Sequence, residues 1–168
     1  MFNGLLDAIF LPPRNWVLNK ALKFKSKDLN NEEIAKLMIA GVEVKDKGQN
    51  KGEITVPAGY ITDLASVPRI CWAFIAPFDV ARAAVIHDIL YEKINGAFKD
   101  GRIPTKKHRE LYRSIADNIF RQGMENSEPS VPNWKIKSAF YAVRMFGRWA
   151  INNSAPRGQK PNQPLVLK

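Results

Sequence analysis

The residues most able to do chemistry lie close together between Arg82 and Tyr91. In a helix, His87 and Tyr91 are four residues apart and share one face. Asp88 is turned from His87 by roughly a quarter of a turn, so it points toward a different partner. The remaining residues are apolar nearly all round, which is typical of a buried helix. A buried histidine and a buried carboxylate are costly unless they are paired, so this segment is the candidate functional centre.

A second apolar stripe, in the helix expected over 105–122, supplies a candidate pairing group. Asp117 lies at the edge of that stripe. If the two helices are antiparallel, the Asp117 carboxylate reaches the imidazole of His87. A carboxylate on one ring nitrogen fixes the tautomer and leaves the other nitrogen as a base that can activate a water. Arg113 and Arg121 flank Asp117 at four-residue spacing, so ordinary surface ion pairs are the alternative.

The polar segment before the first of these helices has two interpretations. In the functional one, Asp63 and backbone oxygens of the loop face the His87 helix, and Thr62, Ser66 and Arg69 support the loop. In the other, an Asp followed by Ser and Pro forms a side-chain-bonded turn with no further role. Ser66 is not predicted to be a nucleophile because it lacks the glycines of a nucleophile elbow. A purely structural role is likewise the alternative for His87.

The elements around these residues predict an α+β fold, with a small antiparallel β-hairpin followed by a mainly helical body that contains two antiparallel site helices. Val42–Val44 and Ile54–Val56 alternate apolar and polar residues as strands do, and Tyr60–Thr62 fits a further short strand. The stretch Trp16–Phe24 fits either a helix or an extended segment. Cap residues, apolar spacing and terminating glycines predict helices over 31–40, 79–94, 105–122 and 132–150. The expected N-caps are Asn30 or Asn31, then Asp79 and Thr105. Gly41, Gly96 and Gly123 are expected to end the first three helices.

The 168 residues suit one domain of ordinary size. Residues 1–27 are predicted to be an N-terminal docking segment, 28–150 a single α+β domain and 151–168 an extended basic tail. Met1–Phe10 is apolar, short and not preceded by a basic region, which indicates an amphipathic docking helix and not a signal peptide. No apolar run is long enough for a transmembrane helix. The single cysteine, Cys71, excludes an intrachain disulfide and favours a reducing compartment.

The net charge of +10 is unevenly distributed, because no acidic residue follows Glu128. A basic surface attracts polyanions such as nucleic acid, anionic lipid headgroups or an acidic protein. The alternative is a solvated helix face and a basic tail that keep the protein soluble. No recognised DNA-binding motif is present, so nucleic-acid binding rests on charge alone. The basic residues beyond Glu128 are Lys135, Lys137, Arg144, Arg148, Arg157, Lys160 and Lys168.

Three motifs, Val56–Arg69, Ala83–Tyr91 and Ala116–Phe120, resemble an uncharacterised domain family that is frequent in bacteriophage and prophage genomes. The likeness runs from about Ile54 to Gly147. It implies a phage origin, in the virion or the host cytoplasm. The family brings no settled activity with it.

The segment Arg82–Tyr91 is also distantly similar to the active-site helix of phospholipase A2 enzymes. Together with Ala116–Phe120, it is similar to the capsid phospholipase domains of parvoviruses, which lack the disulfides. This resemblance implies that His87 activates water, that Asp117 orients His87 and that Tyr91 supports the network.

The same resemblance implies a calcium ion. Asp88 would bind it, and the ion would polarise the ester carbonyl and stabilise the oxyanion. The calcium loop of the family is glycine-rich, whereas residues 68–77 contain no glycine. Either calcium is therefore bound differently, with Asp63 as a further ligand, or the scaffold is retained without lipase activity.

Two functions follow as expectations. The first is a phospholipase A2-like ester hydrolase that acts on phospholipid with a metal-assisted water. The second is a non-enzymatic virion or assembly protein, associated with the tail, neck or capsid, that uses the same scaffold. Its N-terminal segment and basic C-terminal tail would contact other phage virion proteins. Anionic membrane phospholipid and nucleic acid are the further partners that the charge predicts.

Overall fold

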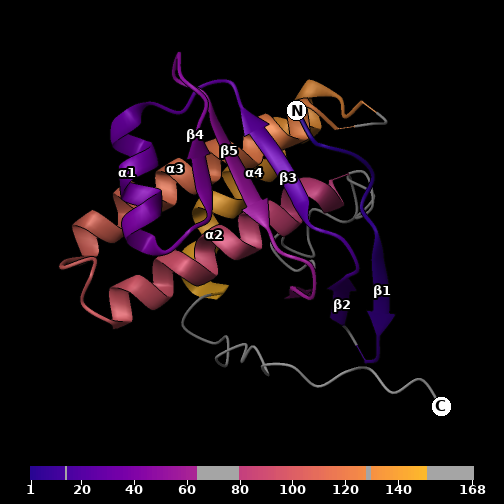
Figure 1. Cartoon of the computed structure of the whole chain (residues 1–168), viewed down its shortest axis with the longest axis horizontal. Coiled ribbons are helices and arrows are strands. Elements are labelled where there is room, and N and C mark those ends of the chain that lie inside the picture. Colours follow the sequence, from indigo (N-terminus) through magenta and orange to yellow (C-terminus); the bar gives the residue numbers. More distant parts are fainter. Residues whose placement is uncertain (14, 64–79, 128–129, 151–168) are drawn as a thin grey trace.

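Short strands come first along the chain and long helices follow, and together they form an α+β fold (Figure 1). The computed structural model describes residues 1–13, 15–63, 80–127 and 130–150. In chain order the described elements are β1 (Ala8–Leu11), β2 (Asn15–Leu18), β3 (Leu22–Ser26), α1 (Asn31–Ala40), β4 (Val44–Asp46), β5 (Gly52–Val56), β6 (Ile61–Thr62), α2 (Ala81–Lys99), α3 (Lys106–Glu125) and α4 (Asn133–Ala150). The predicted fold class is confirmed.

The larger part of the β-structure is an antiparallel sheet with strand order β3-β5-β4. The predicted hairpin is its β4–β5 pair, in which Val44 lies opposite Ile54. The first strand lies later than predicted, because β4 begins at Val44 and not at Val42. On the other side of β5, Phe24 of β3 lies opposite the same Ile54. Both Phe24 and Ile54 are buried, so this sheet contributes directly to the hydrophobic core. The ambiguous stretch Trp16–Phe24 is extended, because it contains β2 and the first half of β3.

The N-terminal residues form a second antiparallel sheet with strand order β1-β2-β6. Ala8 of β1 lies opposite Leu18 of β2, and a further bridge joins Phe2 to Phe24. The amphipathic helix expected over Met1–Phe10 is therefore wrong. Its apolar residues pair with strands that lie further along the chain, and the local sequence pattern does not reveal such partners.

Side-chain caps and a left-handed glycine determine where helices α1 and α3 begin and where α1 ends. Asn30 accepts a hydrogen bond from the backbone N–H of Glu33, whose side chain accepts one from the Asn30 N–H in return, so α1 begins with a capping box. Gly41 ends α1 with a left-handed φ of 85°. Thr105 accepts a hydrogen bond from the backbone N–H of His108 at the start of α3. These predicted caps are confirmed.

Two predicted helix ends are wrong, and both involve glycine. α2 passes through Gly96 and continues to Lys99, because Ala97 packs in the core and this burial outweighs the low helix propensity of glycine. α3 passes through Gly123, where a Cβ atom would lie 2.9 Å from the Cβ of Ala83. Gly123 is thus a close-packing residue and not a helix terminator.

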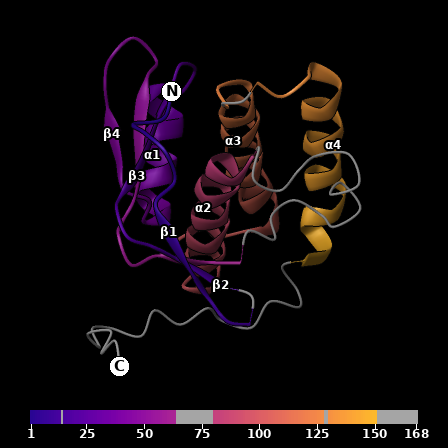
Figure 2. The ribbon, with the colours of Figure 1, turned by 90° about the vertical axis from the view of Figure 1, so that its right-hand side faces the viewer.

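Helices α2 and α3 form the middle layer of the molecule. Figure 2 shows the β3-β5-β4 sheet and α1 on one side of this pair and α4 on the other. The predicted start of α2, Asp79, lies outside the described residues, and so does the predicted tail 151–168. Among the described helices, none combines the length and the apolar composition that a membrane crossing requires.

Candidate functional site

The candidate site lies where α2 and α3 meet. The two helices are antiparallel, because the N-terminal part of α2 meets the C-terminal part of α3 and the reverse. Ala83 lies against Gly123 at one end. At the other end, the Arg109 guanidinium stacks 4.4 Å from the centre of the Phe98 ring. This arrangement brings residues about thirty positions apart in the sequence onto one buried interface.

The Asp117 carboxylate is the centre of a polar network. Its Oδ1 lies 3.0 Å from Nε2 of His87, and the Tyr91 hydroxyl donates to the same oxygen at 2.6 Å. The Arg144 guanidinium of α4 lies 3.5 Å from the other oxygen, Oδ2. His87 and Asp117 are only 2% and 3% exposed, so water does not compete for these contacts.

The second nitrogen of His87 is in a different situation. Nδ1 is buried and has no hydrogen-bond partner among the described residues. The ring stands between two aromatic side chains, with its centre 4.1 Å from that of Tyr91 and 4.9 Å from that of Phe120. If Nε2 carries the proton and donates it to Asp117, Nδ1 holds a free lone pair. Buried polar atoms are rarely left without a partner, so this atom is a candidate for a chemical role.

The environment of Tyr91 keeps its hydroxyl protonated. Burial raises the pKa of the phenol above its ordinary value, and the Asp117 charge and hydrogen bond raise it further. The hydroxyl therefore remains a hydrogen-bond donor throughout the physiological pH range. Tyr91 is thus suited to hold Asp117 in place and not to act as a base.

Asp88 belongs to a separate contact. Its Oδ2 accepts a hydrogen bond from the Thr62 hydroxyl at the end of β6, and both residues are buried. Asp63 follows directly and is half-buried. Thr62, predicted to support the loop, thus contacts α2 through Asp88.

The described residues contain no cluster of three side chains of the types that bind metals. Calcium in proteins takes six to eight oxygen ligands. Nowhere in the described ranges do three His, Cys, Asp or Glu side chains come together in a way that could hold a metal ion. Ser66, Arg69 and the stretch 68–77 lie outside the described residues.

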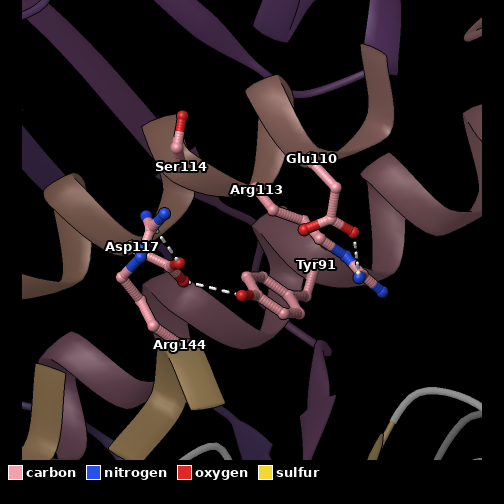
Figure 3. A pocket seen from close by; sticks show the side chains of 6 residues that line it. All are labelled: Tyr91, Glu110, Arg113, Ser114, Asp117 and Arg144. Carbon is pink, nitrogen blue, oxygen red and sulfur yellow. Dashed lines mark hydrogen bonds and ion pairs between the residues drawn. The ribbon is translucent and has the colours of Figure 1, made fainter. Parts of the chain in front are cut away.

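A small polar cleft of about 40 Å³ adjoins the Asp117 network. Figure 3 shows Arg144 directed to Asp117 on one side of Tyr91 and Arg113 directed to Glu110 on the other. A space of this size holds on the order of a few water molecules, too few for a lipid chain. The lining residues are Tyr91, Glu110, Arg113, Ser114, Asp117 and Arg144.

Two arginines differ from the sequence-based expectation. Arg113 is buried and donates to Glu110 at 2.8 Å, so the contact recorded for it is not the ion pair with Asp117 that was the alternative interpretation. Arg121 stacks on Phe140 of α4, with its guanidinium carbon 5.9 Å from the ring centre. The cation near Asp117 is Arg144, which sequence reasoning placed only within a general basic surface. No local pattern marks it, because its contact depends on how α4 packs against α3.

Comparisons with known proteins identify the family. Residues 39–143 match the family described as "Protein of unknown function (DUF1353)". The chain belongs to this family. The matched range contains His87, Tyr91 and Asp117, and Arg144 follows it immediately.

One curated relative comes from Sinorhizobium fredii and is named "Uncharacterized protein y4jT". It is 33% identical to this DUF1353 member over 95 residues, which make up 55% of the chain and 23% of the relative. The chain thus spans less than a quarter of that protein. No solved structure matches the chain.

Proposed function

We propose that this DUF1353 protein is a phospholipase A2-like hydrolase of phospholipid esters in which His87 is the general base. The observation that carries the proposal is the buried imidazole whose Nε2 lies 3.0 Å from Asp117 and whose Nδ1 has no described partner. A carboxylate behind an imidazole is the arrangement that makes the opposite nitrogen a directed base. The choice of ester hydrolysis as the reaction rests on the resemblance of the segments Arg82–Tyr91 and Ala116–Phe120 to phospholipase A2 domains.

The reaction follows from this geometry. Nδ1 of His87 removes a proton from a water molecule as its oxygen bonds to the ester carbonyl carbon. Asp117 stabilises the imidazolium that forms. The imidazolium then gives the proton to the departing alcohol oxygen as the carbon–oxygen bond breaks. Tyr91 and Arg144 hold the Asp117 carboxylate, one at each oxygen. Because Nδ1 is buried, the water and ester require an opening beside α2.

The proposal extends to calcium and to a phage origin. Asp88 and Asp63 would bind calcium together with ligands outside the described residues. The ion would supply Lewis-acid stabilisation of the oxyanion. The motif likeness to phage and prophage proteins supports an origin in a bacteriophage, with a location in the virion or the host cytoplasm.

The test is fatty-acid release from mixed phosphatidylglycerol and phosphatidylcholine vesicles, with calcium and with chelator. Wild type is expected to release fatty acid. His87→Gln is expected to lose roughly a hundredfold or more, as is usual when a general base is removed. His108→Gln is the matched control, because His108 is the other histidine of the chain and lies exposed at the start of α3. A folded wild type that releases no fatty acid under either condition would refute the proposal.

A second candidate function is a non-enzymatic virion or assembly protein, and the exposed strand β1 favours it. β1 is an edge strand, and Ile9, Phe10 and Leu11 are 57%, 48% and 39% exposed. An exposed apolar edge is a typical site for pairing with another chain. Purified phage particles would then contain the protein, and Phe10→Ser would abolish its incorporation while His87→Gln would not. Absence from particles would exclude this candidate.

A further inference from the structure

Helix α4 is the outermost helix of the described residues (Figure 2), and its main contact with another described element is with α3. Its inner face is formed by Ile136, Ala139 and Val143, all buried. These residues pack toward α3, on the side of the α2–α3 pair opposite the β3-β5-β4 sheet (Figure 2). This inner face accounts for the attachment of α4 to the domain.

The outer face of α4 is also apolar. Trp134, Tyr141 and Met145 are 55%, 63% and 70% exposed. At 100° per residue, spacings of seven and eleven residues keep these side chains within about 20° of one line. That line runs opposite the buried inner face. These three exposed side chains lie along one side of the helix, with the exposed polar residue Ser138 between Trp134 and Tyr141. We call the set of Trp134, Tyr141 and Met145 the outer stripe of α4.

The charges around the outer stripe all have one sign. No acidic residue occurs in Asn133–Ala150. Lys137 is exposed beside the stripe, and the Lys135 ammonium lies 5.8 Å from the centre of the Trp134 ring. Arg144 lies at the margin of the stripe, where it reaches Asp117. The stripe is therefore apolar at its centre and cationic at its edges.

We propose that the outer stripe of α4 binds the surface of an anionic lipid membrane. Tryptophan and tyrosine prefer the headgroup region, where one end of the side chain is apolar and the other is hydrated. Lysine and arginine at the margins attract anionic headgroups, and the absence of acids removes any repulsion. The choice of lipid over another polyanion rests on the proposed function.

Membrane binding by the outer stripe of α4 would place the lipid surface close to the His87–Asp117 site. Arg144 belongs to the same helix and contacts Asp117, the residue that orients His87. A membrane seated on α4 therefore lies next to the polar cleft and the buried His87 network. The stripe would hold the protein at the surface that contains its substrate.

The experiment is co-sedimentation of the full chain with vesicles, and it does not depend on catalysis. One set of vesicles is phosphatidylcholine with one third phosphatidylglycerol, and the other is phosphatidylcholine alone. Variants are Tyr141→Ser combined with Met145→Ser, and Lys137→Glu. The matched controls are Met38→Ser, an exposed apolar residue of α1, and Lys107→Glu, an exposed lysine of α3. Circular dichroism checks that each variant is folded.

We expect salt-sensitive binding to the anionic vesicles and at least tenfold weaker binding to phosphatidylcholine. The double variant is expected to weaken binding to the anionic vesicles by roughly tenfold, because apolar burial is lost. Lys137→Glu is expected to weaken it by a similar factor, because attraction to the anionic headgroups is lost. The two controls and His87→Gln are expected to bind as wild type does. Binding that the α4 variants leave unchanged would overturn the proposal, and so would tighter binding to duplex DNA than to vesicles. Vesicle binding without ester hydrolysis would refute the proposed function alone.

Discussion

Helices α2 and α4 both carry apolar side chains on more than one face but have different surroundings. In α2 these faces are covered by the sheet and α1 on one side and by α3 on the other. Among the described elements, the main contact of α4 is with α3. Ile86 and Leu90 of α2 are consequently 1% and 0% exposed, while Met145 of α4 is 70% exposed. An all-round apolar pattern therefore indicates burial only when the fold provides a partner for each face.

The comparison extends to polar groups. α2 buries His87 and Asp88, and each has a partner from another element, Asp117 and Thr62 respectively. In contrast, Lys137 and Arg144 of α4 are exposed, and Lys135 is half-buried. A buried polar group stabilises only those arrangements of the chain in which its hydrogen-bond partner lies beside it. The following predictions test how far the two helices differ.

The largest difference in the free energy of unfolding is expected between truncation of a buried core side chain and truncation of an exposed side chain of α4. Phe120→Ala removes a fully buried ring beside His87 and should lower the free energy of unfolding by about 3–5 kcal/mol. Met145→Ala on the outer stripe of α4 should change it by no more than about 0.5 kcal/mol. Urea denaturation followed by circular dichroism measures both. Equal effects would show that Met145 is packed as closely as Phe120.

Removal of Asp117 should have the next largest effect. Asp117→Ala leaves Nε2 of His87 and the Tyr91 hydroxyl without their acceptor, and each unpaired buried group costs roughly 1–3 kcal/mol. The matched control is Asp100→Ala, which removes an exposed ion pair with Arg102 and should cost below about 1 kcal/mol. The same urea titration compares the two. A smaller effect for Asp117→Ala than for Asp100→Ala would contradict the buried network.

Two glycines within helices should respond in opposite directions. Gly123→Ala places a Cβ atom 2.9 Å from Ala83, so the α2–α3 contact must widen at a cost of about 1–3 kcal/mol. Gly96→Ala meets nothing within 4 Å and should stabilise α2 by roughly 0.5–1 kcal/mol. Thermal unfolding provides the measurement. Stabilisation by Gly123→Ala would show that the helices are not closely packed there.

A small effect, similar in size to that of Gly96→Ala, is expected for loss of the Tyr91 hydroxyl. Tyr91→Phe removes one hydrogen bond to Asp117 and should cost about 1 kcal/mol at neutral pH. Because burial raises the pKa of Tyr91 above its ordinary value of 10.0, the unfolded chain loses the phenol proton first as the pH rises. This contribution to stability is therefore complete below pH 10 and is lost at higher pH.

The measurement is the free energy of unfolding between pH 8 and 11. Wild-type stability should decline above pH 10, the ordinary pKa of the phenol, and the decline should be shallower in Tyr91→Phe. Tyr141→Phe on the outer stripe of α4 is the control, because its side chain is 63% exposed. Identical pH profiles for wild type and Tyr91→Phe would show that Tyr91 is not in the environment described.

The features that the sequence alone determined are those that depend on neighbours within a few residues. The capping box of Asn30 and Glu33, the left-handed Gly41 and the Thr105 cap are each complete within one helical turn, so residue type and spacing suffice to predict them. Period-two alternation likewise identified the β4–β5 hairpin. Helical spacing also placed His87 and Tyr91 on one face, although their catalytic roles stay predictions.

The tertiary structure decided everything that depends on residues far apart in the chain. Only the antiparallel packing of α2 on α3 makes Gly123 a contact residue, and only the packing of α4 brings Arg144 to Asp117. The N-terminal residues become a strand because β2 is available as a partner, which no local pattern indicates. The physical reason is common to these cases. The free energy of burial and pairing depends on the partner surface, and the chain supplies that surface only after it has folded.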